Sequence, residues 1–491
     1  MRIRSAARQR VFLLERRFSV LAALVGLFAC GGSAPKAETD PNDAPVLLDP
    51  PVEPDPAPLE AALPVAAPVL IRSATVMTAS GLIWKQGWVR LRDGLIADLG
   101  EGDAPAAAEG ETVVDGTGKF VTPGLIDTHS HLGVYASPGV WAHADGNEMT
   151  NPITAGVRAE EGFWPQDPGL QRAVAGGVTT LQVLPGSGNL MGGRGVVLKL
   201  HPRREPHAMR FPGAPETVKM ACGENPKRVY GMDKGSMPMS RMGSIFMMRA
   251  KWLEARRYKL RWDQWRKKPY ELKDDKKIPS NPPERDLVLE TLAGVMAGEI
   301  LPQIHCYRAD DMLTQIKLSH EFGWKVRSFH HALEAYKIAD ILARERISVS
   351  TWADWWGFKL EAWDGIEQNL ALVQAAGGIP IVHTDSPEGV QRMNQEAAKG
   401  MTSGRAAGLP VTEDQALRWI TANPAWALGV DAKTGTLEKG KMADVVVWDA
   451  HPFSVYAHAE KVYIDGHLRH DRLSRDQGVP AAPWSDFEVY R

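Results

Sequence analysis

A histidine pair at the end of an apolar run is the feature that most constrains this chain. Residues 121–131 read Val-Thr-Pro-Gly-Leu-Ile-Asp-Thr-His-Ser-His, so one residue separates His129 from His131. In a β-strand the side chains of residues i and i+2 point to the same face. Two imidazoles leaving one strand end in parallel lie about as far apart as two ligands of one cation need to be. The alternative is a pair of surface histidines, but the apolar run before them favours a buried strand that ends in a metal site.

The body of the chain alternates between short apolar runs and longer amphipathic runs, which is typical of alternating strands and helices. We expect eight strands, at residues 125–131, 178–184, 196–200, 217–222, 301–307, 325–331, 347–353 and 379–385. We expect helices at residues 284–298, 310–322, 332–344, 361–376 and 412–428. This order predicts an α/β fold, a closed parallel (β/α)8 TIM-like barrel whose active site lies at the carboxyl ends of the strands.

Four later strand ends carry side chains of metal-binding or metal-bridging type. They are Lys219 with Glu224 shortly after it, His305, the adjacent His330 and His331, and Asp385. Neighbouring residues of a strand face opposite ways, so only one of the two adjacent histidines can face the site. Neutral imidazoles with a carboxylate suit Zn²⁺, and Mn²⁺, Fe²⁺ and Co²⁺ are also compatible.

The motifs of residues 67–475 resemble those of the amidohydrolase superfamily, and within it of imidazolonepropionase-like members. The first-strand motif of that superfamily reads P-G-x-[ILV]-D-x-H-x-H, and Thr421-Ala-Asn-Pro-Ala425 and Gly440-Lys-Met-Ala-Asp-Val-Val-Val-Trp448 add to the resemblance. The resemblance implies a set of metal ligands in the order of the superfamily: His129, His131, His305, His331 and Asp385. It also favours His331 over His330, which then packs outside or supports a ligand.

Lys219 decides how many metal ions the resemblance implies. In binuclear relatives a lysine of the fourth strand, carboxylated by CO₂, bridges two ions, whereas mononuclear relatives lack it. The alternatives are a surface-paired or substrate-contacting lysine, and Lys199 on the preceding strand is a rival. We favour a binuclear site through Lys219, with Glu224 as the fallback carboxylate.

Such a site predicts hydrolysis of a C–N bond in a linear or cyclic amide. A bound divalent metal lowers the pKa of a water molecule. Asp385 then takes the water's proton and returns it to the leaving nitrogen, while the metal or His331 polarises the carbonyl. Tyr307 and Arg308 are expected to contact the substrate, although helix capping by Asp310 is an equally good interpretation of that segment. The alternatives are a dipeptidase or prolidase-like peptidase, a less favoured deaminase, and a metal-free surface binding protein on a barrel scaffold.

Both ends of the chain are rich in short alternating strands. Residues 67–120 and 430–475 predict one small composite β-sandwich beside the barrel of residues 121–429, with a tail at 476–491. The superfamily resemblance implies the same arrangement.

The first residues predict export. Six arginines precede a short apolar run that ends in Leu-Phe-Ala-Cys30, which looks like a bacterial lipoprotein signal over residues 1–29. Cys30 would be lipidated, and the Pro- and Ala-rich residues 30–66 would tether the protein to the periplasmic side of the outer membrane. The alternative is an ordinary secretory signal cut nearby, which would leave the protein free in the periplasm.

Several further features are compatible with this interpretation. The net charge of -2 gives no footprint for nucleic acid, so we expect a small amide or short peptide as the partner, with a homo-oligomer left open. The basic, aromatic segment 232–277 predicts a solvated helix on the barrel at 247–266, with membrane or nucleic-acid contact as the alternative. Cys222 and Cys306 are interpreted as buried thiols. The glycine-rich residues 184–195 are interpreted as a flexible loop that approaches the substrate, with a simple flexible turn as the equal alternative. Trp352, Trp355 and Trp356 are expected to form a pocket wall or core.

Overall fold

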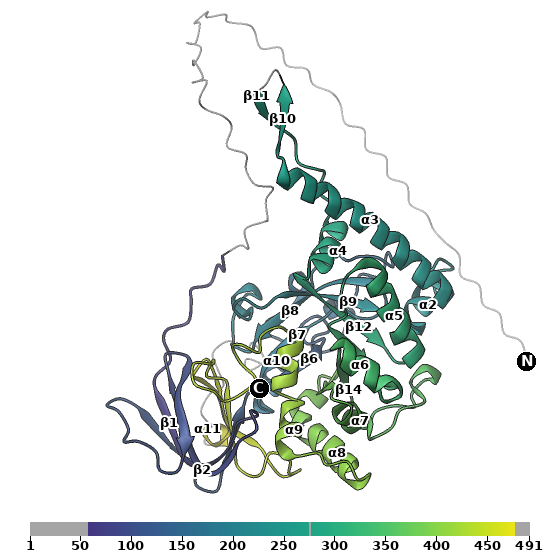
Figure 1. The fold of residues 1–491 in the computed structure, drawn as a ribbon. Coiled ribbons are helices and arrows are strands. Elements are labelled where there is room, and N and C mark those ends of the chain that lie inside the picture. Colours follow the sequence, from purple (N-terminus) through teal and green to yellow (C-terminus); the bar gives the residue numbers. More distant parts are fainter. Residues whose placement is uncertain (1–56, 274–275, 477–491) are drawn as a thin grey trace, which may run out of the picture. The chain divides into compact units, whose positions relative to one another are not determined.

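The computed structural model describes residues 57–273 and 276–476 (Figure 1). The predicted signal segment 1–29 with the tether up to residue 56, including Cys30, and the tail beyond residue 476 lie outside the described residues. Within the described part, two eight-stranded sheets and one two-stranded hairpin are present. No described helix is long and apolar enough to cross a membrane.

One eight-stranded sheet combines strands from both ends of the described chain. The N-terminal strands are β1 (Val69–Met77), β2 (Ile83–Arg92), β3 (Leu95–Glu101), β4 (Thr112–Asp115) and β5 (Phe120–Pro123), and the C-terminal strands are β16 (Val445–Trp448), β17 (Ala459–Ile464) and β18 (His467–Asp471). The strand order is β18-β17-β16-β5-β1-β2-β3, with β4 beside β1. β5 pairs antiparallel with β16 and leads directly into the first barrel strand, so this sheet adjoins the strand that carries the histidine pair. The short helix α11 (Arg472–Asp476) follows β18.

The second eight-stranded sheet forms a nearly closed (β/α)8 barrel. Its strands are β6 (Leu125–Ser130), β7 (Val178–Val183), β8 (Met191–Lys199), β9 (Glu216–Ala221), β12 (Ile300–Cys306), β13 (Ser328–His331), β14 (Ser348–Thr351) and β15 (Ile379–Val382), paired in this order. Between β15 and β6 the chain segment at Trp419 and Ile420 takes the place of a direct ladder. The Trp419 carbonyl accepts the Val382 N–H at 3.0 Å, and the Ile420 carbonyl accepts the Ile126 N–H at 2.9 Å.

The third barrel strand corrects the expectation of an all-parallel barrel. β8 runs antiparallel to both β7 and β9. A parallel connection needs a crossover of about a dozen residues or more, and only residues 184–190 lie between β7 and β8. The glycine-rich stretch expected as a flexible loop therefore lies partly within β8. A Cβ on Gly193 would lie 2.6 Å from Val157, and one on Gly195 would lie 2.7 Å from Leu184, so these glycines permit close packing.

Helices cover the barrel, and several are shorter than expected. They are α1 (Pro168–Ala175), α2 (Glu224–Lys227), α3 (Arg241–Lys267), α4 (Leu287–Ala297), α5 (Ala309–Phe322), α6 (Ala339–Glu345), α7 (Asn369–Ala375), α8 (Met393–Ala406), α9 (Glu413–Arg418) and α10 (Ala422–Ala427). The segments expected as helices at 332–344 and 361–376 begin with short 3₁₀ turns at Ala335–Ile338 and Leu360–Ala362. The helix expected at 412–428 is two helices, because the chain between α9 and α10 bonds to β15 and β6.

The basic segment expected as a helix at 247–266 lies within α3. Its buried residues recur every three or four positions, as one face of a packed helix requires: Met248, Trp252, Ala255, Tyr258 and Trp262. Trp252 stacks on Trp324 with ring centroids 4.9 Å apart, while most of the arginines and lysines lie on the other faces. Figure 1 shows α3 leading into the hairpin of β10 (Tyr270–Lys273) and β11 (Lys276–Pro279).

A cluster of paired charges joins β8 to the terminal sheet. The ammonium of Lys199 lies 2.9 Å from Asp444 and also pairs with Asp465, which accepts a hydrogen bond from His201 at 2.8 Å. Arg469 donates to the other ring nitrogen of His201 at 2.9 Å. We call these five residues the junction cluster.

Candidate metal centre

The structure brings all six predicted ligands together at the strand ends. The Nε2 atoms of His129 and His131 lie 3.7 and 3.4 Å from Asp385 Oδ1, and His331 Nδ1 lies 4.0 Å from Asp385 Oδ2. The rings of His305 and His331 have centroids 4.5 Å apart, and Lys219 Nζ lies 3.3 Å from His129 Nε2. Two overlapping triads could each hold a cation: His129, His131 and Asp385, and His129, His331 and His383.

Hydrogen bonds fix which nitrogen of His129 faces the site. His330 Nε2 donates to the side-chain oxygen of Gln303 at 2.8 Å, so His330 Nδ1 is left as an acceptor. That atom lies 2.9 Å from His129 Nδ1, which must therefore carry the proton. The lone pair of His129 is then on Nε2, facing Lys219 and Asp385. His330, which the sequence left as outer packing or support, thus orients His129 through its ring.

The second histidine of the pair is oriented in the same way. His131 Nδ1 donates to the carbonyl oxygen of Leu184 at 2.7 Å, which leaves the Nε2 lone pair of His131 facing Asp385. Both residues of the His-x-His motif therefore present Nε2 to one carboxylate.

Unpartnered nitrogens mark the remaining histidines. Among the described residues, the Nδ1 atoms of His305, His331 and His383 are buried without a hydrogen-bond partner. Buried polar atoms are normally paired, and each exception needs an explanation. His331 Nδ1, which faces the Asp385 carboxylate at 4.0 Å, fits a bound cation that would take up its lone pair.

Burial keeps these imidazoles in the neutral form that binds metal. It lowers the pKa of His131 and of His383 to about 3, and it holds the pKa of His129, His305 and His331 well below the usual range. The ammonium of Lys219 contributes in the same direction. At neutral pH each ring therefore keeps a lone pair without having to lose a proton.

Lys219 and Asp385 face each other across the site. Burial lowers the pKa of Lys219 to about 8, and burial with the nearby Asp127 raises the pKa of Asp385 to about 7. Lys219 Nζ donates only to the Pro185 carbonyl, at 3.2 Å, apart from its approach to His129. The side chain of Asp385 is 23% exposed, so water reaches the carboxylate. A lysine with a lowered pKa and a carboxylate with a raised one are groups that can exchange protons near neutrality.

Two residues of the site were missed by the sequence interpretation. Asp127 is fully buried, and its carboxylate accepts the backbone N–H of His129 and the hydroxyl of Thr384, so it ties β6 to the segment that carries Asp385. His383 Nε2 accepts the backbone N–H of His331 at 3.2 Å. Asp127 is part of the quoted motif and His383 precedes Asp385 by two residues, so same-face spacing could have indicated both.

The backbone is turned at two of the ligands. His331 has φ of 68° and Asp385 has φ of 50°, in the left-handed region that residues with a Cβ seldom occupy. Such conformations persist where surrounding contacts impose them, and they cluster at functional sites.

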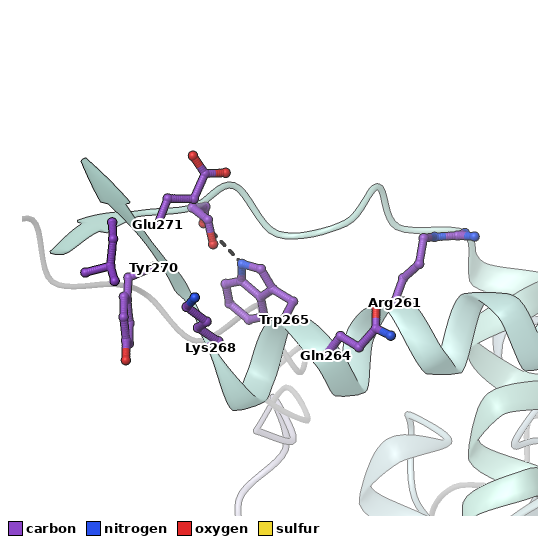
Figure 2. Close-up of a pocket in the computed structure, with 8 residues that line it drawn as sticks. Arg261, Gln264, Trp265, Lys268, Tyr270 and Glu271 are labelled. Atoms are coloured by element: carbon purple, nitrogen blue, oxygen red, sulfur yellow. Dashed lines mark hydrogen bonds between the residues drawn. The ribbon is translucent and has the colours of Figure 1, made fainter. Parts of the chain in front are cut away.

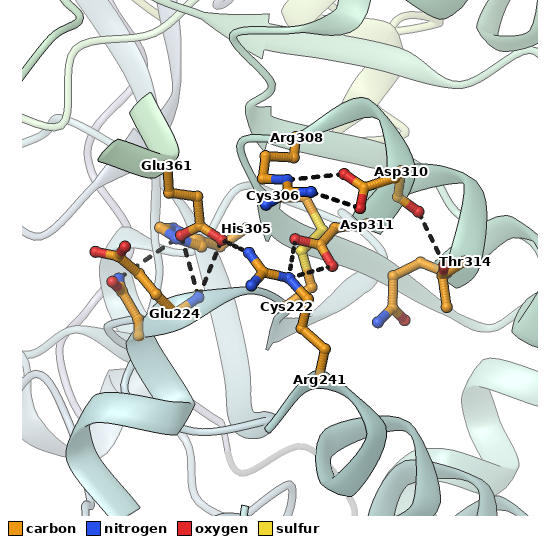
Figure 3. The surroundings of a disulfide bond; sticks show 12 residues. Cys222, Glu224, Arg241, His305, Cys306, Arg308, Asp310, Asp311, Thr314 and Glu361 are labelled. Carbon is orange, nitrogen blue, oxygen red and sulfur yellow. Dashed lines mark hydrogen bonds and ion pairs between the residues drawn. A yellow bond between two sulfur atoms is a disulfide. The ribbon is translucent and has the colours of Figure 1, made fainter. Parts of the chain in front are cut away.

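Tyr307 and Arg308, both expected to contact substrate, are placed differently. The Tyr307 ring stacks on His331, with centroids 5.2 Å apart, and lies beside His305. Arg308 is 42% exposed and forms a two-bond ion pair with Asp310 on the outer side of α5 (Figure 3). Asp310 is in the first turn of α5 and the position before that helix is Arg308, so the capping interpretation of Asp310 is wrong.

Cys222 and Cys306 form a disulfide bond, which corrects their interpretation as buried thiols (Figure 3). Cys222 directly follows β9 and Cys306 ends the neighbouring strand β12, so their side chains meet although they are 84 residues apart in sequence. Cys306 directly follows His305, and the Cys222 N–H donates to the His305 carbonyl at 2.9 Å. The disulfide thus lies immediately behind a predicted ligand.

Glu224, the fallback carboxylate, belongs to a network of charges beside the disulfide. Its Oε1 lies 3.1 Å from Lys359 Nζ, and its backbone N–H donates to Glu361, which also pairs with Arg241 (Figure 3). Glu224 is thus satisfied by protein partners and is not among the groups of the two triads.

A separate hollow of about 570 Å³ lies between the end of α3 and the β10–β11 hairpin (Figure 2). Trp265 lines it and donates to the Ser280 carbonyl at 3.1 Å. None of the predicted ligands lines this hollow, so the site rests on the convergence of ligands.

Comparisons with known proteins agree with this fold. A family model described as the amidohydrolase family matches residues 332–470. The chain is 35% identical to an amidohydrolase of known structure from Thermotoga maritima MSB8, with a TM-score of 0.73, covering 82% of this chain and all of that one. It is 32% identical over 444 residues to amidohydrolase tasK of Hapsidospora irregularis, covering 82% of this chain but only 43% of that protein. It is 27% identical over 436 residues to the imidazolonepropionase of Mesorhizobium japonicum, covering 80% and 93%.

These similarities and the barrel define a class of metal-dependent hydrolases that act on carbon–nitrogen bonds. The chain belongs to the amidohydrolase superfamily and is imidazolonepropionase-like.

Proposed function

We propose that this enzyme hydrolyses the C–N bond of a small linear or cyclic amide, with Asp385 as the carrier of the proton. One observation carries the proposal: His129 and His131 both present an Nε2 lone pair within 3.7 Å of the same carboxylate oxygen of Asp385. This arrangement supports a cation beside a proton acceptor, which amide hydrolysis requires.

The residues of the chain suggest how the steps are divided. A divalent cation held by these ligands would lower the pKa of a water molecule and polarise the amide carbonyl. Asp385, with a pKa raised to about 7 by burial, is suited to accept the water's proton and to release it later to the leaving nitrogen. Asp127 holds the backbone on both sides of the site, and His330 keeps His129 in one tautomer.

We also propose that Lys219 is carboxylated and bridges two ions, with Zn²⁺ as the first candidate metal. Carboxylation joins the uncharged amine of Lys219 to CO₂ and releases one proton, so it needs a lysine that loses its charge readily. The lowered pKa of Lys219 supports this step, as does the absence of a carboxylate ion pair with Lys219 within 4 Å among the described residues. The new carboxylate would lie beside His129 Nε2, where the lysine nitrogen now lies.

Metal analysis with an amide panel tests the proposal. Full-length protein purified without chelator should contain at least one equivalent of Zn²⁺ or a similar ion and should hydrolyse cyclic or linear amides. Less than about half an equivalent of any transition metal, in material never exposed to chelator, would overturn the metal site. Metal-loaded protein that cleaves no member of a panel of cyclic amides, N-acyl amino acids and dipeptides would overturn the reaction class.

For location, we propose export with lipidation of Cys30, followed by anchoring to the outer membrane through the segment 30–66. The Cys222–Cys306 disulfide supports export, because disulfides persist mainly in oxidising compartments. Replacement of Cys30 by serine should release the protein from the membrane fraction. A Cys30→Ser variant that stays fully membrane-bound would mean that another part of the chain, such as the basic helix α3, makes the attachment.

A further inference from the structure

We propose that four aromatic side chains beside the histidines bind a planar, uncharged aromatic group of the substrate. These residues are Tyr307, Trp352, Trp355 and Phe358, and we call them the aromatic wall. The inference rests on the proposed function and adds a substrate class to it: amides that carry an aryl ring near the bond to be cut.

The inner half of the wall is fixed against the metal centre. Tyr307 and Trp352 are buried, and both stack on the His331 ring, with centroids 5.2 and 4.5 Å away and planes tilted by 22° and 26°. Trp352 Nε1 donates to the Thr384 carbonyl at 3.0 Å, immediately before Asp385. The ring of Trp352 is thereby held next to the groups proposed to carry out the reaction.

The outer half of the wall continues from these buried rings towards solvent. Trp355 and Phe358 are 45% and 46% exposed. The Trp355 ring lies 4.7 Å from Trp352 and 5.1 Å from Phe358, and Phe358 lies 6.1 Å from Tyr307. Single exposed apolar residues are common, but contiguous exposed rings that lead to a reactive centre are typical of ligand surfaces.

The charges near the wall favour a neutral aryl group over a cation, the two kinds of ligand that bind to aromatic rings. Lys359 Nζ lies 4.2 Å from the centre of the Tyr307 ring and is held by Asn225 at 3.0 Å and Glu224 at 3.1 Å. Lys359 therefore already occupies the Tyr307 ring face on which a substrate cation would make a cation–π contact. A neutral aryl group can instead make offset or edge-to-face stacking with the exposed rings of the wall.

Three matched ligands separate stacking from simple apolar burial and from charge. They are N-acetylphenylalaninamide, N-acetylcyclohexylalaninamide, which keeps the shape without the aromatic ring, and N-acetyllysinamide. Their dissociation constants would be measured by calorimetry on zinc-loaded, full-length Asp385→Asn protein, in which hydrolysis is suppressed. We expect the phenyl compound to bind roughly tenfold more tightly than the lysyl one and a few times more tightly than the cyclohexyl one.

Variants of the exposed rings assign that preference to the wall. Trp355→Ala and Phe358→Leu should each raise the dissociation constant of the phenyl compound by roughly three- to tenfold. The dissociation constant of the lysyl compound should stay unchanged. Trp363→Ala is the matched control, because this tryptophan is 68% exposed and is not one of the four stacked rings.

The outcomes separate this inference from the proposed function. Equal binding of the three ligands, no measurable binding, or variants that bind like their parent would overturn the aromatic wall as a binding surface. Wild-type hydrolysis of amides without aryl preference would overturn the wall and leave the proposed function intact. Ring-dependent binding by a wild-type protein that cleaves no amide would support the wall and overturn the proposed function.

Discussion

Two buried clusters of the same residue types lie at different places on the barrel, and they differ in how their polar atoms are satisfied. The junction cluster contains Lys199 and His201 with two aspartates, and both ring nitrogens of His201 have protein partners. The metal centre contains Lys219 and a group of histidines with Asp385, and three of its buried ring nitrogens have none. Since buried polar groups are costly unless paired, the first cluster is satisfied by protein partners, whereas the second has the unpaired groups that a cation site needs.

The two buried lysines show the same contrast. Lys199 has two carboxylate partners, Asp444 and Asp465, whereas no carboxylate of the described residues forms an ion pair with Lys219 within 4 Å. The direction of β8 explains why they do not compete for the site. Because β8 runs antiparallel to its neighbours, its last residue, Lys199, lies at the opposite end of the barrel from the carboxyl ends of β6 and β9.

Replacing one aspartate of each cluster by asparagine should give the largest difference in kcat between the two clusters. Asp385→Asn should lower kcat by about a thousandfold or more, because an amide cannot accept the water's proton. Asp444→Asn should leave kcat within about threefold of wild type but lower the free energy of unfolding by about 3 kcal/mol, because it breaks a buried ion pair with Lys199. Steady-state kinetics and urea unfolding measure the two effects.

These two variants could also break the comparison. If Asp385→Asn keeps kcat within about tenfold of wild type, Asp385 is not the proton carrier. If Asp444→Asn loses activity while staying folded, the junction cluster is coupled to the chemistry.

The next largest effect should come from replacing the buried lysine of each cluster. Lys219→Ala should lose one metal equivalent and about a hundredfold in activity, and short carboxylic acids should restore part of it by taking the place of the carboxylated side chain. The Lys199→Met variant should keep its metal, because the Lys199 side chain contacts the junction residues, Phe211 and Met442, none of which is a predicted ligand. Elemental analysis of both variants measures the number of metal equivalents per protein. Unchanged metal content in Lys219→Ala would indicate a mononuclear site.

A smaller effect should appear in the dependence of stability on pH. In the folded, metal-free protein the pKa of each buried histidine of the centre is lowered by burial, to about 3 for His131 and His383. An unfolded histidine takes up its proton near pH 6.5, so below that pH the unfolded chain binds more protons than the folded one. Stability should be complete above pH 6.5 and fall by more than about 1 kcal/mol per pH unit as the pH drops below it.

Asp465 of the junction cluster should respond in a lower pH range, whereas burial lowers the pKa of His201 to about 4, so His201 adds to the loss of stability below pH 6.5. Interaction with His201 and Lys199 lowers the pKa of Asp465 to about 2 despite burial, so its contribution is present above about pH 4 and is lost as the pH falls through 2. Urea unfolding of chelated protein at pH 7.5, 6.5 and 5.5 tests the contribution of the centre. His383→Asn should reduce the slope, and His320→Gln, at an exposed histidine, should not. Equal stability at all three values would contradict the neutral state of these histidines.

The convergence of the candidate ligands was predictable from sequence, because each lies at or just after a strand end within a short local pattern. The His-x-His motif at residues 129–131 needs only strand alternation and a buried run. The direction of β8 was not predictable in this way, because it depends on how few residues connect β8 to β7 and on which strands pair with it. The Cys222–Cys306 bond was missed for a related reason, since cysteine pairing depends on which strands become neighbours.

Residues that act through others were also beyond the sequence pattern. The adjacency of His330 and His331 shows that they face different ways, but not that His330 bonds to His129 and Gln303. Arg308 followed a predicted ligand closely enough to suggest contact with substrate, yet its partner is the nearby Asp310. The role of a long charged side chain such as Arg308 depends on which oppositely charged group lies within its reach in the folded protein.

Substitution of Arg308 should have the smallest effect, and it tests whether the site extends as far as the start of α5. The Arg308 guanidinium is exposed and already forms two hydrogen bonds to the Asp310 carboxylate, at 2.9 Å each. Exposed ion pairs contribute at most about 1 kcal/mol to stability. Arg308→Ala should therefore change the equilibrium constant of unfolding by less than about fivefold, and kcat/KM by less than about fivefold as well. Tyr307→Ala is the comparison, because that ring is buried against His331 and its loss should raise KM for aryl amides. If Arg308→Ala instead raised KM for anionic substrates by tenfold or more, Arg308 would have to leave Asp310 during binding, and the boundary of the site would extend to the start of α5.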